Sequence, residues 1–184
     1  MKVLAIIGSP REHGNTTALV NAVIRGAESA GHEVEIVNLT NLSISDCVAC
    51  CKCKISKDRC SIHDDMQNLY PKIEEADCLV IGTPVYMGQM TGKMKSFFDR
   101  WYTFMDADYQ IHDIPGKKYI TITCSGAPAE VFQSLTDYFN HWLGSFFKME
   151  LVKNIVAGGL GAPAAINAQP ELIRMAETTG RSLK

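Results

Sequence analysis

The amino-acid sequence predicts an α/β protein in which helices cover both faces of a parallel β-sheet. Short apolar segments rich in β-branched residues recur along the chain, and stretches with helical spacing of apolar residues separate them. Strands that alternate with helices form βαβ units, whose right-handed crossovers make the strands parallel and place helices on both faces. With 184 residues the chain has the length of one domain, and we expect a single domain over residues 1–184.

Five segments are expected to be strands. They are Lys2 to Ile7, Glu33 to Asn38, Cys78 to Gly82, Lys118 to Cys124 and Leu151 to Ala157. Five strands in this rhythm fit a doubly wound three-layer sandwich with the strand order 2-1-3-4-5. In such a sheet the ligand binds outside the carboxyl ends of the strands, near the switch point between strands 1 and 3. Functional loops are therefore expected directly after strands.

Apolar residues three and four positions apart indicate the helices between these strands. The sets are Val20, Val23, Ile24 and Ala27, then Met94, Phe97, Phe98 and Trp101, then Leu135, Tyr138, Phe139 and Trp142. A last helix is expected from Pro170 to Leu183, because proline is favoured at the first helical position. The connections 39–61 and 103–116 are unusually long, and long loops are commonly functional.

Charge and hydropathy exclude several classes of partner. The formal net charge of −2 leaves no basic excess to neutralise phosphates, so no nucleic-acid partner is expected. No apolar run approaches the roughly 20 residues that span a bilayer, so no membrane association is expected. The segment Met1 to Gly8 is too short for the apolar region of a signal peptide, and it leads into a glycine-containing motif. We therefore expect a cytoplasmic protein.

The segment after the first strand has the character of a phosphate-binding loop. Gly8 and Gly14 permit a tight turn, and a helix follows. The unpaired amides and dipole of a helix N-terminus favour an anion. Further donors are the hydroxyls of Ser9, Thr16 and Thr17 and the guanidinium of Arg11. The motif is neither a Walker A loop nor GxGxxG, so a phosphate monoester fits best. The alternative is that Asn15 or Thr16 merely caps the helix.

Two further loops follow neighbouring strands and could contact a planar group. In the loop 82–92, Pro84 stiffens the turn, Tyr86 offers an aromatic face, and Gly88 allows the backbone to approach a ring. The loop that starts at Ser125 and Gly126 follows the fourth strand. Each loop alone could be an ordinary turn with some aromatic packing. Three such loops at consecutive carboxyl ends favour a shared ligand.

The motifs GSPREHGNT after the first strand and TPVYMGQMTGKMKSFFDR around the third resemble the NADPH-dependent FMN reductase branch of the flavodoxin-like superfamily. The resemblance covers essentially the whole chain and implies a flavodoxin-like three-layer sandwich that binds FMN. It assigns the phosphate to Ser9, Arg11, Asn15, Thr16 and Thr17. It places the isoalloxazine ring against Pro84, Val85, Tyr86, Met87 and Gly88, near Ser125 and Gly126. It also implies a homodimer or homotetramer with flavin sites at the subunit interface.

Five of the seven cysteines fall in the loop 46–61, which follows the second strand and is therefore expected at the same edge of the sheet as the three loops above. In a reducing compartment, clustered cysteines are more often metal ligands or redox groups than structural disulfides. The set Cys47, Cys50, Cys53 and Cys60 could close around an iron–sulfur cluster or a zinc ion, and spacing alone does not decide between them. Cys51 offers an alternative ligand. Cys78 and Cys124, inside apolar strands, are interpreted as buried hydrophobic residues.

The cysteine spacing is similar to that of the iron–sulfur flavoproteins, in which a 4Fe–4S cluster lies near FMN. This resemblance favours a 4Fe–4S cluster held by the four cysteines, with zinc or unmetallated thiols as the alternatives. The expected function is then electron transfer between the cluster and FMN by a flavin-dependent oxidoreductase. The electron donor would be ferredoxin if the cluster is present, or NAD(P)H if it is not, and no catalytic side chain is expected.

Two alternative functions remain open from the sequence. One is an NAD(P)H-dependent FMN or quinone reductase without a cluster. The other belongs to a different class and is a non-catalytic interaction module, in which a zinc-bound cysteine loop forms a binding surface on a flavodoxin-like scaffold.

Overall fold

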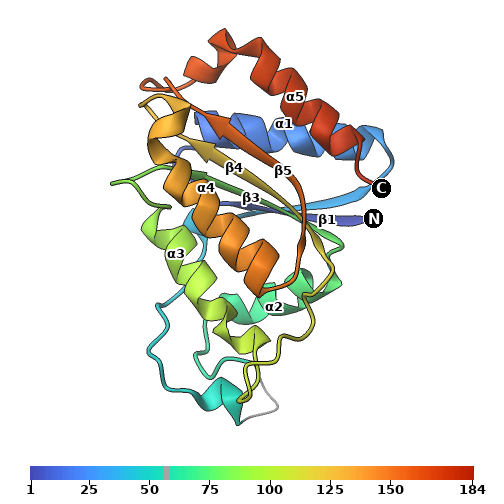
Figure 1. Cartoon of the computed structure of the whole chain (residues 1–184), viewed down its shortest axis with the longest axis vertical. Helices are drawn as coiled ribbons and strands as arrows, with labels where there is room; N and C mark the ends of the chain where they lie inside the picture. Colours follow the sequence, from blue (N-terminus) through green and yellow to red (C-terminus); the bar gives the residue numbers. More distant parts are fainter. Residues whose placement is uncertain (56–58) are drawn as a thin grey trace.

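The computed structural model describes residues 1–55 and 59–184 (Figure 1). Within these ranges, five strands form one parallel sheet with the order β2-β1-β3-β4-β5. The strands are β1 (Lys2–Ile7), β2 (Glu33–Asn38), β3 (Cys78–Pro84), β4 (Lys118–Cys124) and β5 (Glu150–Ala157). The predicted fold class and strand order are therefore confirmed. The predicted strand boundaries differ only in β3, which continues to Pro84, and in β5, which begins at Glu150.

Helices cover both faces of the sheet, as Figure 1 shows. They are α1 (Asn15–Ser29), α2 (Met66–Glu75), α3 (Gly92–Asp99), α4 (Gln133–Phe139) and α5 (Pro170–Arg181). Side chains alternate along each strand between the two faces. In β1, Val3 and Ala5 pack in the core under α1 and α5, whereas Leu4 and Ile6 pack in the core under α2, α3 and α4. The sheet is thus buried on both faces, which explains its nearly continuous apolar strands.

Helix α2 is an element that the apolar spacing did not predict. Met66, Leu69, Tyr70 and Ile73 are all buried, at the i, i+3, i+4 and i+7 spacing of a helix face. Pro71 lies inside the same helix. Proline disfavours a helix interior because it removes one hydrogen bond and crowds the preceding turn. Packing of the apolar face against the sheet outweighs that local preference.

Helix α3 is shorter than the stretch of helical spacing that contains it. It ends at Asp99, and a tighter 3₁₀ segment, Arg100–Phe104, follows directly. This change of pitch lets Trp101 pack edge-on against both Phe97 and Phe104, with ring centroids 5.7 Å apart in each pair. It also turns Arg100 into the protein interior.

Helices α1 and α5 pack closely at two glycines. A Cβ atom at Gly26 would lie 1.9 Å from the carbonyl oxygen of Glu177, and one at Gly180 would lie 1.9 Å from that of Val23. Neither position can therefore carry a side chain without moving a helix. In the described part of the chain, no helix combines the length and the apolar character that crossing a bilayer requires.

Candidate functional site

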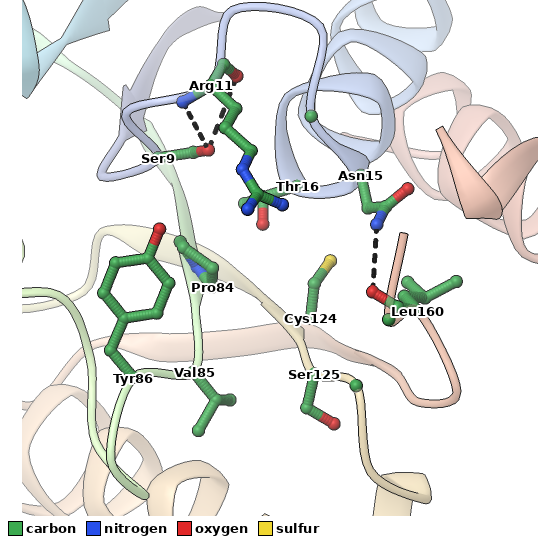
Figure 2. Close-up of a pocket in the computed structure, with 13 residues that line it drawn as sticks. Ser9, Arg11, Asn15, Thr16, Pro84, Val85, Tyr86, Cys124, Ser125 and Leu160 are labelled. Atoms are coloured by element: carbon green, nitrogen blue, oxygen red, sulfur yellow. Dashed lines mark hydrogen bonds between the residues drawn. The ribbon is translucent and has the colours of Figure 1, made fainter. Parts of the chain in front are cut away.

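A cleft of about 180 Å³ opens at the carboxyl ends of the strands, where the sequence predicted the ligand (Figure 2). Loops that follow β1, β3, β4 and β5 all contribute to it. Its lining residues are Ser9, Arg11, Gly14, Asn15, Thr16, Pro84, Val85, Tyr86, Cys124, Ser125, Gly126, Leu160 and Gly161. Nine of the twelve predicted flavin-contacting residues are brought together here; Thr17, Met87 and Gly88 are not among the lining residues.

One end of the cleft is built to receive an anion. Helix α1 starts at Asn15 with no side-chain cap and no acidic residue in its first turn. Within the described ranges, the backbone N–H groups of Asn15, Thr16 and Thr17 have no protein acceptor. These free donors carry the positive end of the helix dipole. Figure 2 shows the side chain of Arg11 extending into the same space. The end of the cleft at α1 therefore fits a phosphate group.

Hydroxyl groups hold the loop before α1 in shape. The Ser9 hydroxyl accepts a hydrogen bond from the N–H of Arg11 at 3.2 Å. The Thr17 hydroxyl donates to the carbonyl oxygen of Arg11 at 3.0 Å, and the N–H of Gly14 donates to the same oxygen at 3.1 Å. The side chain of Thr17 therefore shapes the loop from behind, whereas Thr16 lines the cleft.

Asn15 connects α1 to the loop after β5. Its side-chain amide donates to the carbonyl oxygens of Leu160 at 3.3 Å and Ala162 at 2.9 Å, and its oxygen accepts from the N–H of Ile166 at 3.0 Å. These bonds leave its backbone N–H, rather than its side chain, for an anion. The loop with Leu160 and Gly161 was not predicted as part of the site. Its signal was the glycine cluster at 158, 159 and 161 directly after the last strand.

The other end of the cleft is apolar and aromatic. Pro84 ends β3, and the N–H of Val85 donates to the carbonyl oxygen of Cys124 at 2.8 Å, which fixes the two strand ends together. Tyr86 and Gln89 exchange two backbone hydrogen bonds around a two-residue turn. At the tip of this turn Met87 is fully exposed and has a φ of 49°, and Gly88 has a φ of 79°.

The loop after β4 forms a further wall of the cleft. Burial raises the pKa of the Cys124 thiol to about 11, although a hydrogen bond with Thr16 opposes this effect. Cys124 is therefore a neutral, weakly polar lining group, which agrees with its predicted burial. The Ser125 hydroxyl donates to the carbonyl oxygen of Ala127 at 2.9 Å. A Cβ atom at Gly126 would lie 3.5 Å from the Cα of Gly161, so the loops after β4 and β5 approach each other closely at this wall.

The cysteines lie at a second pocket, at the far end of α3. Its lining includes Cys47, Cys50, Cys51, Cys53 and Cys60, together with residues 99, 100, 102 and 103. The sequence led us to expect the cysteine loop at the same edge of the sheet as the flavin loops. The loop does begin there, after β2, but it continues along α3 to the C-terminal end of that helix (Figure 1). The eight residues of α3 correspond to about 12 Å of helix, so the two pockets are separate.

The thiols of this pocket differ in environment. Cys47, Cys50 and Cys51 are exposed, and Cys53 and Cys60 are half-buried. Hydrogen bonds from the Ser61 hydroxyl and from the backbone of Lys52 lower the pKa of Cys50, whereas burial raises the pKa of Cys53. Across residues 1–55 and 59–184, no three His, Cys, Asp or Glu side chains are arranged to hold a single metal ion. The donor set, five thiols around one cavity, still fits the ligand chemistry of an iron–sulfur cluster.

Ion pairs and hydrogen bonds hold the cysteine loop against the rest of the protein. Lys54 donates to the carbonyl oxygens of Tyr102 and Met105, and its ammonium group lies 3.5 Å from the ring centroid of Tyr102. Arg59 pairs with Glu74 and Asp113, each at 2.7 Å. The loop is therefore attached on both sides of residues 56–58.

Together, the doubly wound sheet and a cleft at its switch point that fits an anion define a flavodoxin-like protein. The family model described as NADPH-dependent FMN reductase matches residues 1–160, and the chain belongs to this family, as the sequence motifs predicted. An iron-sulfur flavoprotein from Methanosarcina thermophila is 30% identical over 141 residues, which cover 76% of this chain and 73% of that protein.

An iron-sulfur flavoprotein from Archaeoglobus fulgidus is 38% identical over 100 residues, which cover 54% of this chain and 45% of that protein. The chain thus spans about half the length of that relative. Among solved structures, an NAD(P)H:quinone oxidoreductase from Methanothermobacter marburgensis superposes with a TM-score of 0.76 at 21% identity. That alignment covers 98% of this chain and 96% of the other, and it supports the fold.

Proposed function

We propose that this chain is an FMN-dependent oxidoreductase that transfers electrons through a flavin bound in the cleft. The observation that carries the proposal is the combination of free N–H groups and Arg11 at one end of the cleft with Pro84 and Tyr86 at the other. A phosphate joined to a planar ring matches both ends. Membership of the FMN reductase family supports the same cofactor.

The residues have distinct tasks in this proposal. The backbone N–H groups of residues 15–17 and the guanidinium of Arg11 bind the phosphate, with the hydroxyls of Ser9 and Thr16 beside it. The segment 84–86 and the loop at Ser125 and Gly126 position the ring and exclude water from it. FMN supplies the redox chemistry when it is bound, so no side chain is required as an acid or base.

The cysteine pocket extends the proposal to a 4Fe–4S cluster held by Cys47, Cys50, Cys53 and Cys60. Two observations support it: the thiols surround one cavity, and relatives carry the name iron-sulfur flavoprotein. Electrons would then pass between the cluster and FMN, with ferredoxin or NAD(P)H as the donor. Because the two pockets of one chain lie at opposite ends of α3, we favour a homodimer or homotetramer, as the family resemblance also implies. The free thiols agree with a reducing, cytoplasmic location.

A second candidate is an NAD(P)H-dependent FMN or quinone reductase in which the cysteines carry no iron. The absence of a single-ion site among the described residues and the structural similarity to a quinone oxidoreductase make it worth testing. It differs from the first in its donor, because a nicotinamide alone would sustain turnover.

The first test is the visible absorption spectrum of protein purified without oxygen, before and after reduction. Flavin bands over a broad brown absorbance that bleaches would support FMN with a cluster. Flavin bands alone would support the second candidate, and a colourless protein that takes up no FMN would overturn both.

The assigned cleft is tested with Thr16→Leu, which places a larger apolar side chain among the phosphate donors. We expect it to lose FMN, whereas Thr178→Leu on the exposed side of α5 should retain it. For the cluster, Cys60→Ser should lose iron, and Cys78→Ala in the buried strand should keep it. Unchanged flavin in the Thr16 variant would contradict the phosphate site.

A further inference from the structure

Arg100 is a buried cation at the base of the cysteine pocket. It follows α3 directly and is 1% exposed. A guanidinium group has five N–H donors, and its burial is costly unless the charge is paired and the donors are bonded. The hydrogen-bond partners of these donors therefore indicate the role of the Arg100 side chain.

Four contacts join the two terminal nitrogens to the two ends of the cysteine loop. Nη1 donates to the carbonyl oxygen of Ser45 at 3.0 Å and to Asp64 Oδ2 at 2.7 Å. Nη2 donates to the carbonyl oxygen of Ile62 at 3.3 Å and to Asp64 Oδ1 at 3.2 Å. Arg100 thus donates hydrogen bonds to the chain before and after the cysteines, and it binds both oxygens of one carboxylate.

The fifth donor, Nε–H, is buried and has no partner among the residues that the structure describes. Arg100 is one of the residues that line the pocket of the five cysteines. Burial opposes its charge, but the hydrogen bonds to Asp64 outweigh burial and raise the pKa of Arg100. A permanently charged residue that lines a pocket of thiols and keeps one buried donor unpaired favours an anionic group in that pocket.

We propose that Arg100 donates its Nε–H to a sulfur atom of the cluster, and that this hydrogen bond raises the reduction potential of the cluster. The inference rests on the cluster that the proposed function assigns to this pocket. Reduction adds negative charge to the cluster, and a neighbouring cation that donates a hydrogen bond stabilises the reduced form more than the oxidised form. Hydrogen bonds to sulfur are among the factors that set the potential of such clusters.

The test compares Arg100→Lys with Lys52→Gln in protein that has been reconstituted with iron and sulfide. Lysine keeps the charge of Arg100 but cannot bind both oxygens of Asp64 and still present a third fixed donor. Lys52 is an exposed cation of the same loop, so its removal controls for a general loss of charge. At a fixed applied potential, the reduced-to-oxidised ratio of the cluster should fall about tenfold or more in Arg100→Lys. That ratio corresponds to about 59 mV for one electron. It should change less than about twofold in Lys52→Gln.

A second measurement begins with the wild-type protein alone. Resonance Raman bands of the iron–sulfur stretches in the wild-type protein should shift on transfer to D₂O, because an exchangeable N–H bonds to sulfur. The shift should shrink in Arg100→Lys. If the wild-type bands do not shift, or if an iron-loaded Arg100→Lys keeps the wild-type potential, the inference is wrong and the proposed cluster stands. If the wild-type protein takes up no iron at all, the proposed cluster itself fails, and the inference fails with it.

Discussion

Asp64 is the counterion of Arg100, and it connects three parts of the chain. Its side chain is 7% exposed. Besides both terminal nitrogens of Arg100, it accepts the N–H of Ser45 at 2.8 Å and the N–H of Met66 at 3.1 Å. The start of the cysteine loop, the start of α2 and the end of α3 therefore meet at one carboxylate. The pairing of Asp64 with Arg100 has no local signal in the sequence, because Arg100 lies 36 residues further along the chain.

Replacing Asp64 by asparagine leaves the charge of Arg100 buried without a counterion. We expect Asp64→Asn to lower the free energy of unfolding at pH 7 by about 3–5 kcal/mol, measured by urea denaturation. Burial alone would raise the pKa of Asp64, but the hydrogen bonds from Arg100 and Ser45 outweigh it and lower that pKa below the ordinary 3.8. The unfolded chain therefore binds the proton first as the pH falls.

The sign of this shift defines the pH dependence. The stabilisation by Asp64 is complete above the ordinary pKa of 3.8 and is lost as the pH falls through the lower pKa of the folded state. The difference between wild type and Asp64→Asn should accordingly shrink at acid pH. Asp65→Asn is the matched control, because Asp65 accepts the N–H of Ser43 in an exposed position. A difference that stays constant down to acid pH would contradict the role of this ion pair.

At the scale of elements, the contact between α1 and α5 depends on two glycines. A methyl group at Gly180 would overlap the carbonyl oxygen of Val23, which belongs to the helix backbone and cannot rotate away. We expect Gly180→Ala to lower the free energy of unfolding by about 1–3 kcal/mol despite the better helix propensity of alanine. Gly92→Ala, where a Cβ atom has nothing within 4 Å, should be neutral or slightly stabilising. Equal stability of the two variants in thermal or urea unfolding would refute this packing.

The strands could be predicted almost to the residue, because a buried parallel sheet requires uninterrupted apolar segments. The close packing of α1 and α5 at their glycines could not be predicted, because the sequence does not show which helices are in contact. Helix α2 was missed because Pro71 interrupts its local signal, and tertiary packing decides its conformation. Of the four loops that line the cleft, those after β1, β3 and β4 could be predicted because each directly follows a strand. The role of Asn15, by contrast, could not be predicted, because its partner Leu160 lies 145 residues further along the chain.

At the scale of the whole molecule, α3 separates two sites that share no lining residue. The cleft lies beyond its N-terminal end, and the cysteine pocket lies at its C-terminal end. The backbone of each site is held by its own contacts. Asn15 binds the loop after β5 at the cleft, and Arg100 with Asp64 binds the loop ends at the cysteines. Within the proposed function, occupancy of one site should therefore not depend on occupancy of the other.

This independence predicts a double dissociation of the two cofactors. Thr16→Leu should lose FMN but retain iron, and Cys60→Ser should lose iron but retain FMN, because neither residue lines the other pocket. Flavin is measured by fluorescence after release from denatured protein, and iron by a colorimetric assay of the same sample. Bound FMN should still stabilise the Cys60 variant, by about 2.7 kcal/mol at a ligand concentration one hundred times the Kd. The fold of Cys60→Ser is checked by circular dichroism. If this variant released its flavin with an unchanged fold, the two sites would be coupled through α3, and the prediction that they are occupied independently would be wrong.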